Sequence, residues 1–366
     1  MNYTYLHYQI GMTLLSGVGP VRARTLLAHL TDIEEFYQLS PSELARKTGF
    51  KTTFLREMER DLALEKAVKI ADHMTANSIH SVFFTDPNFP RRLNTCSDGP
   101  LLLYSVGNFN YNAQRTVAVV GTRNATSYGS ALCRALIESF QDKGISVVSG
   151  LALGIDACAH SFCLELGVPT IGVLGHGLDR IYPAVHRSLA GKMLTHGGLV
   201  TEFIPGTDPD RENFPKRNRI VAGLCDATIV VESKRSGGSL ITAQLANEYN
   251  RDVFAFPGNV DRETSLGCNE LIATQQAHLL SSPESFLEMM GWTETTVETR
   301  PQRAIFQELS ADQQRIVEVL AQAPGVQIDV LAMKTALPIT ALNVELFQLE
   351  MGGVIRALPG KAYSMA

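Results

Sequence analysis

The fold is decided by the stretch TVAVVGTR, which covers residues 116–123. Its β-branched and small apolar residues run without interruption into a glycine turn, which is typical of a short strand buried on both faces. Similar stretches recur along the chain and are separated, in most cases, by segments long enough for a helix. The expected strands are 116–120, 145–149, 170–174, 199–202, 227–231 and 253–256, and the expected helices include 130–141, 155–166 and 240–249. This alternation predicts an α/β fold: a Rossmann-like core with a parallel sheet covered on both faces.

The chain divides by pattern into three domains and a linker. Spaced apolar residues predict a helical domain over residues 1–76. The Rossmann-like domain is expected at 77–292. A polar, proline-ended linker at 293–303 precedes a last domain at 304–366.

The N-terminal domain contains the stretch LSGVGP at 15–20. This stretch resembles a helix-hairpin-helix, in which a Gly-x-Gly hairpin offers backbone N–H groups to a DNA phosphate. Arg22 and Arg24 follow the hairpin and would add positive charge. The alternative is a packing domain similar to a sterile alpha motif, with no DNA contact. The sequence leaves the two equally open.

The C-terminal domain has the pattern of a winged helix. Its expected helices are 311–321, 329–336 and 339–351, and its expected strands, 354–357 and 362–365, flank Pro359-Gly360. The third helix stands where winged helices usually read the major groove, yet its residues 339–350 include two acids and neither Lys nor Arg. Carboxylates would face phosphates there. We therefore expect this domain to serve protein contacts or regulation.

Composition limits what the chain can bind and where it works. The 366 residues are 45% hydrophobic and carry a formal net charge of -5, so positive charge for nucleic acid must be concentrated in a patch. The six cysteines form no CxxC pair, which argues against a zinc ribbon and favours a reducing compartment. No secretory signal or membrane-length apolar run is present. We expect a cytoplasmic protein.

A glycine- or serine-rich turn follows each expected strand. In an open parallel sheet these turns gather at the carboxyl edge, where glycine lets the backbone approach an anion. The simpler explanation, that glycine only makes tight turns, would suffice for one loop but is weaker for six. Both dinucleotide and P-loop signatures are missing, because no GxGxxG follows the first strand and no GxxxxGK[ST] occurs. We predict no cofactor and no metal.

Basic residues beside these turns point to a polymer backbone. Arg123 lies on the first turn, and a basic cluster that includes Phe214 follows the fourth strand. Phosphate contacts and a stacking aromatic are the usual elements of single-strand recognition. The alternatives are a solvated charged face or ion pairs with Glu202, Asp226 or Glu232. We favour Arg123, Phe214, Lys216 and Arg219 over Arg211 and Lys234.

Several motifs resemble one known family. They are VVGTR at 119–123, SGLALGID at 149–156, FPKRNRIVAG at 214–223, SGGSLITA at 236–243, FPGN at 256–259 and GCN at 267–269. They occur in the order found in the DNA-processing protein A family (DprA, also called Smf), and they cover most of the middle region.

This resemblance implies a function and its partners. Members of that family bind single-stranded DNA, form dimers, and help load RecA on incoming DNA during natural transformation; they are not known as enzymes. The resemblance also implies that Arg123 is the family's essential arginine, that Lys216 and Phe214 line its basic pocket, and that single-strand binding protein is a further partner. The predicted DNA-binding residues are Gly121, Thr122, Arg123, Gly150, Phe214, Lys216, Arg217, Asn218, Arg219, Gly237, Gly238 and Ser239.

Two other interpretations give the chain an enzymatic or a scaffolding function. Asp156 and His160 lie four residues apart on an expected helix, but no third ligand has helpful spacing, so we favour structural roles for both. Phosphoribohydrolases of the LOG type share a similar layout and a PGGxGTxxE loop. Gln244 stands where their catalytic glutamate would be, and an amide cannot act as a carboxylate base. A scaffold with incidental DNA affinity is the remaining alternative.

Overall fold

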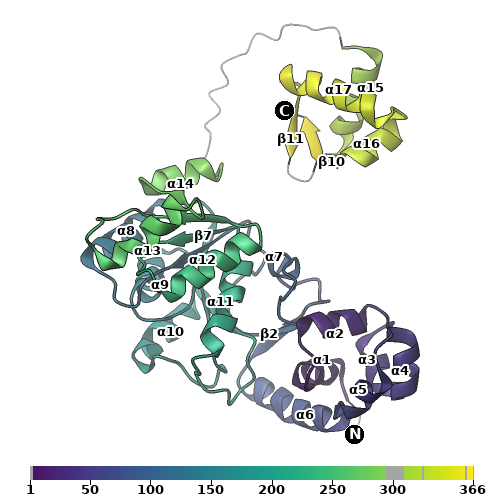
Figure 1. Cartoon of the computed structure of the whole chain (residues 1–366), viewed down its shortest axis with the longest axis vertical. Coiled ribbons are helices and arrows are strands. Elements are labelled where there is room, and N and C mark those ends of the chain that lie inside the picture. Colours follow the sequence, from purple (N-terminus) through teal and green to yellow (C-terminus); the bar gives the residue numbers. More distant parts are fainter. Residues whose placement is uncertain (1–2, 294–308, 324, 359–360, 366) are drawn as a thin grey trace. The chain divides into compact units, whose positions relative to one another are not determined.

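The computed structural model describes residues 3–293, 309–323, 325–358 and 361–365. The chain forms two compact units, Met1–Thr293 and Glu294–Ala366 (Figure 1). All of the predicted linker except Thr293 lies outside the described residues, as do the first residues of the predicted C-terminal domain. The domain boundaries therefore stay predictions.

A nine-stranded sheet forms the centre of the first unit, in the order β1-β2-β6-β5-β4-β3-β7-β8-β9. Strands β3 to β9 pair in parallel, whereas β1 and β2 join one edge antiparallel. The strands are β1 His80–Phe83, β2 Leu102–Gly107, β3 Arg115–Val120, β4 Ile145–Ser149, β5 Thr170–Val173, β6 Gly197–Thr201, β7 Ala227–Val230, β8 Asp252–Ala255 and β9 His278–Leu279. The predicted Rossmann-like fold and its six parallel strands are confirmed. Strands β1, β2 and β9 were not predicted.

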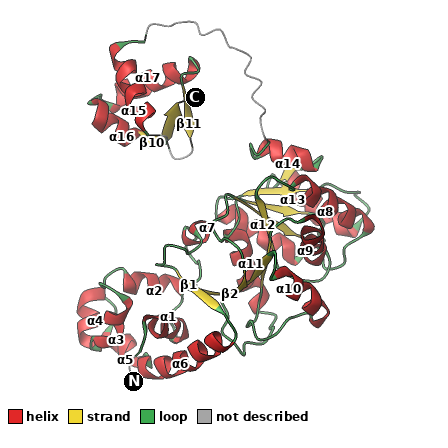
Figure 2. Ribbon diagram, turned by 180° about the vertical axis from the view of Figure 1, so that it is seen from behind, coloured by secondary structure: helices red, strands yellow, loops and turns green. Residues whose placement is uncertain are grey.

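Helices cover both faces of this sheet (Figure 2). Alternate residues of β3 show why: Ala118 and Val120 pack in one core with α7, α11, α12 and α13, while Val117 and Val119 pack in another with α8, α9 and α14. Strands buried on both faces give the continuous apolar runs of the sequence. The helices are α7 Arg91–Asn94, α8 Ser127–Ser139, α9 Ile155–Leu166, α10 Arg187–Met193, α11 Asn213–Gly223, α12 Gly238–Glu248, α13 Glu263–Ala273 and α14 Pro283–Met289, with a short 3₁₀ turn at Ala184–His186.

The N-terminal part of this unit is helical, as predicted. Its helices are α1 Tyr5–Leu14, α2 Pro20–Leu27, α3 Ile33–Gln38, α4 Pro41–Thr48, α5 Thr52–Glu57 and α6 Arg60–Ala76. Their apolar core includes Phe83 of β1 and Tyr104 of β2. The helical region is therefore packed on the antiparallel edge of the sheet, which explains why both regions form one compact unit.

The predicted hairpin connects α1 and α2, and Gly17 there has a positive φ of 72°. Arg22 donates to the carbonyl oxygen of Gly17 at 2.7 Å. Arg24 donates to Asn94 at 2.8 Å, and its guanidinium lies 4.4 Å from the ring centroid of Phe84. The guanidinium of Arg24 therefore packs inside the unit, which favours the alternative of a packing domain. Contact of the N-terminal helices with DNA stays a prediction.

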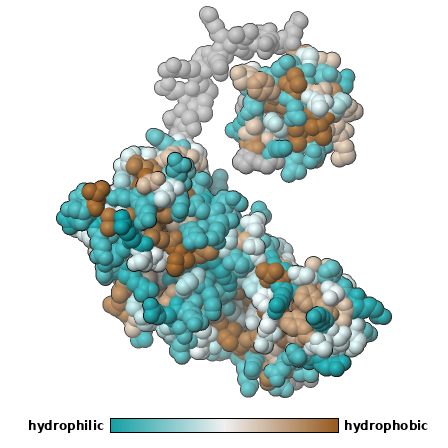
Figure 3. Space-filling model, in the orientation of Figure 1, coloured by the Kyte–Doolittle hydropathy of each residue, from teal (hydrophilic) through white to brown (hydrophobic). Residues whose placement is uncertain are grey.

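The second unit is a winged-helix domain, as predicted. Helices α15 Ala311–Gln322, α16 Ile328–Thr335 and α17 Ile339–Met351 pack with the strands β10 Val326–Gln327, β11 Ile355–Leu358 and β12 Ala362–Met365 around a core of their own. Pro359-Gly360 lies outside the described residues. Helix α17 leaves Phe347 64% and Met351 74% exposed. Hydrophobic residues, in brown, are gathered on the visible face of this unit in Figure 3.

Among the described residues, no single helix has the length and apolar composition of a membrane span, although α16 and α17 would match one together if their bend of 108° is ignored. The described part of the chain also places no three His, Cys, Asp or Glu side chains in a group that could hold a metal ion.

Candidate nucleic-acid interface

The carboxyl edge of the sheet carries a pocket of about 690 Å³. It lies where β3 is flanked by β4 on one side and β7 on the other, so that chain connections leave in opposite directions. Ligands of open α/β sheets bind at such switch points. Loops after β3, β4 and β7 and the start of α11 form its walls. Among the residues that line it are Gly121, Thr122, Arg123, Gly150, Asp156, Tyr182, Arg211, Phe214, Arg217, Asn218, Lys234, Gly237, Gly238 and Ser239.

The turn after β3 is held from both sides. The amide of Thr122 donates to the Glu232 carbonyl oxygen at 2.8 Å, and its carbonyl accepts from the amide of Ile155 at 3.1 Å. A Cβ at Gly121 would come within 2.6 Å of the Ile155 side chain, so only glycine fits between β3 and α9. These bonds fix the position from which the exposed Arg123 side chain extends into the pocket.

Arg123 lies beside an aromatic pair. Its guanidinium carbon is 5.6 Å from the ring centroid of Phe214, which is the first-turn aromatic of α11. The ring of Tyr182 lies 5.9 Å from that of Phe214, tilted by 36°, and Tyr182 is 50% exposed. An arginine and two accessible rings in one pocket match the chemistry of a phosphate followed by a base.

Two further basic side chains line the pocket. Arg211 is exposed, and among the described residues neither it nor Arg123 has a carboxylate within 4.0 Å. Lys234 is there as well, but it bonds the Glu263 carboxylate at 2.9 Å. Arg211 and Lys234 were ranked below Lys216 and Arg219, and the structure reverses that order by position.

Arg217 lines the deep end of the pocket rather than its surface. It is 5% exposed, and its Nη1 donates to the Val173 carbonyl oxygen at 2.7 Å, while its Nε is buried and has no partner among the described residues. Asp156, also buried, accepts from the amides of Gly150 at 3.1 Å and Ala152 at 3.4 Å. Burial raises the pKa of Asp156 and lowers the pKa of Arg217, and the charge of each opposes the shift of the other. This buried pair of opposite charges shapes the pocket floor.

Two predicted contacts lie outside the pocket. Arg219 pairs with the largely buried Glu202 and donates to the Asp98 carbonyl oxygen at 2.6 Å. Its side chain is therefore used inside the protein, as the alternative of an arginine pairing with Glu202 foresaw. Lys216 is exposed on α11 but does not line the pocket. Helical geometry explains both results, since residues two and five positions after Phe214 point away from its face.

The remaining predicted residues come together. Gly237 and Gly238 begin α12 beside Asn218, whose side-chain amide is 3.4 Å from the Gly238 carbonyl oxygen. Ser239 is buried and donates to the Ser233 hydroxyl at 2.8 Å, so it supports the turn. Tyr182 was missed by sequence reasoning. It belongs to the segment after β5, outside the basic cluster around Phe214, and its only signal was an aromatic residue before Pro183.

Asp156 and His160 have the structural roles that we favoured. His160 is fully buried, and its Nδ1 lies 2.7 Å from the Thr170 hydroxyl, which in turn donates to the Val147 carbonyl oxygen. Burial lowers the pKa of His160 to about 3, so the ring is neutral. Gln244 does not line the pocket; its side-chain amide donates to Glu248 at 2.9 Å. The position that would hold a catalytic base in a LOG-type enzyme is thus neither acidic nor in the pocket.

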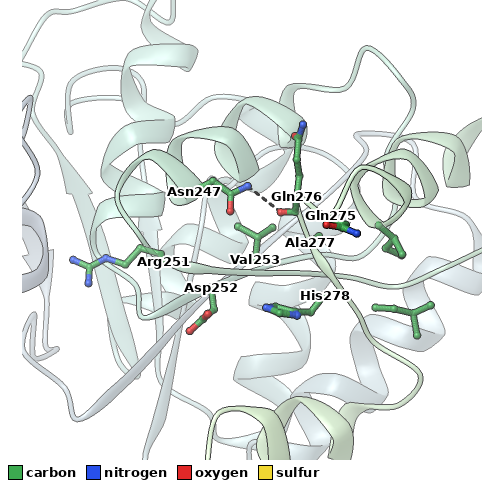
Figure 4. Close-up of a pocket in the computed structure, with 10 residues that line it drawn as sticks. Asn247, Arg251, Asp252, Val253, Gln275, Gln276, Ala277 and His278 are labelled. Carbon is green, nitrogen blue, oxygen red and sulfur yellow. Dashed lines mark hydrogen bonds between the residues drawn. The ribbon is translucent and has the colours of Figure 1, made fainter. Parts of the chain in front are cut away.

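A second pocket, of about 490 Å³, lies where β8 and β9 begin (Figure 4). Asn247 donates to the Gln276 carbonyl oxygen at 2.9 Å across it. Arg251, at its rim, donates to the Arg92 carbonyl oxygen at 2.9 Å. It opens at the amino end of β8, away from the loops that follow the strands. Of its polar side chains, Asn247 and Arg251 are thus bonded to backbone carbonyl oxygens.

Comparison with known sequences gives the same architecture. The sequence model of the family described as DNA recombination-mediator protein A matches residues 80–291, and that of the DprA winged helix domain matches residues 300–361. The chain is 32% identical to protein Smf of Synechocystis over 97% of its own length and 98% of that protein.

Two solved structures are similar at the level of the fold and sequence. DNA processing protein A from Streptococcus pneumoniae is 32% identical with a TM-score of 0.65, and the match covers 79% of this chain and 98% of that one. DNA processing protein A from Helicobacter pylori, whose structure addresses its single-stranded DNA binding mode, is 28% identical with a TM-score of 0.53 and matches 58% of this chain and 95% of its own.

Proposed function

The chain belongs to the DNA recombination-mediator protein A family, and we propose that it binds single-stranded DNA in the pocket at the carboxyl edge of its sheet. One observation carries this proposal. Arg123 and Arg211, two exposed arginines without carboxylate partners among the described residues, line one pocket with the accessible rings of Phe214 and Tyr182. Phosphates would bind the guanidinium groups, and unpaired bases would stack on the rings.

The aromatic pair favours a single strand over a duplex. In a duplex each base face is covered by its neighbours, so stacking on Phe214 would require unpairing at a cost of a few kcal/mol. A single strand presents those faces freely, and each stacked base contributes about 1–3 kcal/mol. The gain is similar for all bases, since every base has an aromatic face, so we expect weak sequence preference.

The biological role that we propose is that of a recombination mediator rather than an enzyme. The family membership and the Helicobacter pylori relative support action on single-stranded DNA in recombination, and we propose that this occurs during natural transformation. We propose that the bound strand is handed to RecA, with single-strand binding protein as a further partner. The acidic, apolar surface of α17 suits a protein contact better than a phosphate backbone. A hydrolase of the LOG type would need a base that Gln244 cannot supply.

We also propose that the protein works as a homodimer in the cytoplasm. Strand β9 is a two-residue sheet edge, and nearby exposed apolar residues include Leu279 at 48% and Met289 of α14 at 49%. An exposed edge beside apolar side chains invites pairing with another chain. Light scattering coupled to size exclusion should report a dimer, and Leu279→Lys should shift it toward the monomer; a wild-type monomer at micromolar concentration would contradict this.

A gel shift with single- and double-stranded oligonucleotides of the same sequence tests the proposed function. We expect wild type to shift the single strand at much lower protein concentration, and Arg123→Ala to lose that shift. Arg134→Ala removes an equal charge from α8, outside the pocket, and should behave as wild type. Unchanged binding by Arg123→Ala, or equal affinity for both DNA forms, would overturn the proposal.

A further inference from the structure

A smaller pocket, of about 250 Å³, lies on the same edge of the sheet, between the loops after β3, β7 and β8. Its walls include Tyr128, Asn259 and Arg262, together with the side chain of Glu232. None of these residues lines the first pocket. In the sequence, none of these residues belongs to a cluster of basic residues.

The two pockets are direct neighbours. Lys234, which lines the first, bonds the carboxylate of Glu263 at 2.9 Å, and Glu263 stands between two residues that line the second, Arg262 and Thr264. The amide of Thr122 in the first pocket donates to the backbone of Glu232, whose side chain lines the second. The Lys234–Glu263 ion pair thus connects the walls of the two pockets.

Tyr128 provides a fixed aromatic surface in the second pocket. Its hydroxyl donates to the Pro257 carbonyl oxygen at 2.6 Å, and its Cε1 lies within 3.7 Å of where a side chain at Gly258 would begin. One side of the ring is thus held against the turn after β8, yet 46% of the residue is exposed. A ring anchored at its tip loses little conformational entropy when a base stacks on it.

Arg262 supplies the positive charge beside that ring. It is exposed at the start of α13, and in the described part of the chain no carboxylate lies within 4.0 Å of it. The one carboxylate in the pocket wall, Glu232, is 2% exposed and is occupied by the amide and hydroxyl of Thr126, at 3.0 and 2.6 Å, and by the Thr264 hydroxyl at 3.3 Å. Those donors satisfy its charge and reduce its repulsion of a phosphate.

We propose that Tyr128 and Arg262 form a second subsite for the same DNA strand, in which a base stacks on Tyr128 and its phosphate contacts Arg262. This inference rests on the proposed function, since the first pocket is what holds the strand. Arg123 and Tyr128 are five residues apart in sequence, so their backbones are separated by at most about 18 Å. A strand of a few nucleotides therefore spans both subsites.

Oligonucleotide length is the variable that tests the subsite. Fluorescence anisotropy is measured with a probe of about 15 nucleotides, which fills both pockets, and with a dinucleotide, which is shorter than the roughly four nucleotides of the smallest single-strand sites and fills only one pocket. We expect Tyr128→Ala and Arg262→Ala each to weaken binding of the long probe at least about fivefold and to leave the short probe unchanged. Tyr128→Phe keeps the ring and should retain most of the long-probe affinity.

The outcomes separate this inference from the proposed function. Arg123→Ala should weaken binding of both probes. If it does while Tyr128→Ala binds the long probe as wild type does, the subsite is overturned and the first pocket stands. An equal loss on both probes in Tyr128→Ala also overturns the subsite, because the ring would then act on the first pocket. If Arg123→Ala changes neither probe, the proposed function itself fails. Thermal unfolding of each variant confirms that the fold is retained.

Discussion

The guanidinium group of Arg217 occupies the space that a side chain at Gly150 would need, so that a Cβ built on Gly150 would overlap Nη1. The turn after β4 and helix α11 are thereby fitted to one another at the floor of the pocket. A side chain at this position would have to push the buried guanidinium aside.

The first prediction concerns this contact. Gly150→Ala should displace the Arg217 guanidinium from the Val173 carbonyl oxygen and lower the free energy of unfolding by about 3 kcal/mol, from overpacking and a buried donor left without a partner. Affinity for single-stranded DNA should fall with it. Gly191→Ala is the matched control, because nothing lies within 4 Å of a Cβ there and the residue is inside α10. Chemical denaturation that shows equal stability for both variants would contradict the packing argument.

A second prediction separates stability from DNA binding at Arg219. Arg219→Ala leaves the largely buried carboxylate of Glu202 without its partner, which should cost about 3 kcal/mol of stability. The cost should shrink at acidic pH, because burial already raises the pKa of Glu202 and a protonated carboxyl needs no cation. Once folded, the variant should bind single-stranded DNA as wild type does. A large loss of affinity in a variant of normal stability would place Arg219 back in the interface.

A third prediction concerns stacking on Phe214. Phe214→Leu keeps an apolar side chain against Gly175 but removes the aromatic face, so affinity for a single strand should fall about tenfold, the equivalent of 1.4 kcal/mol. Double-strand affinity should hardly change. Val185→Ala, at a residue 73% exposed outside the pocket, serves as the control. Anisotropy titrations in which Phe214→Leu and the control agree would exclude stacking at this ring.

The fourth prediction is a pH dependence of stability caused by His160. Burial lowers the pKa of this ring from 6.5 to about 3 in the folded protein. The contribution of the neutral ring to the free energy of unfolding is thus complete above about pH 6.5. It is lost as the pH falls toward 3, because the unfolded chain binds the proton first, and at pH 5 the loss is about 2 kcal/mol. His160→Asn retains a donor for Thr170 but does not titrate. Its stability should change less than that of wild type between pH 7 and pH 5, and parallel curves would refute the assignment.

Much of the fold could be read from the sequence. Strands buried on both faces, such as Val117–Val120, leave uninterrupted apolar runs, and the glycine turns after them mark the carboxyl edge. Strand β2 was missed although its start is equally apolar, because a short apolar run does not by itself distinguish a strand from a buried helix. Strand β9 has two exposed residues and no pattern to detect.

The site was predictable by region but not by side chain. Proximity in sequence grouped Lys216, Arg217 and Arg219 with Phe214, yet on α11 these residues point in different directions: one to solvent, one to the pocket floor and one to Glu202. Tyr182 and Tyr128 enter the edge from segments outside the basic cluster around Phe214. Only the packing of α11 and the loops against the sheet decides which side chains share a pocket.

The salt dependence of single-strand binding tests the central claim most directly. The slope of the logarithm of the association constant against the logarithm of salt concentration counts the phosphate contacts, with about 0.7 for each contact on a single strand. We predict that Arg123→Ala and Arg211→Ala each weaken binding and each reduce the slope by about 0.7, whereas Arg134→Ala on α8 changes neither quantity. Slopes and affinities equal to those of wild type in both pocket variants would contradict a phosphate site at the carboxyl edge of the sheet.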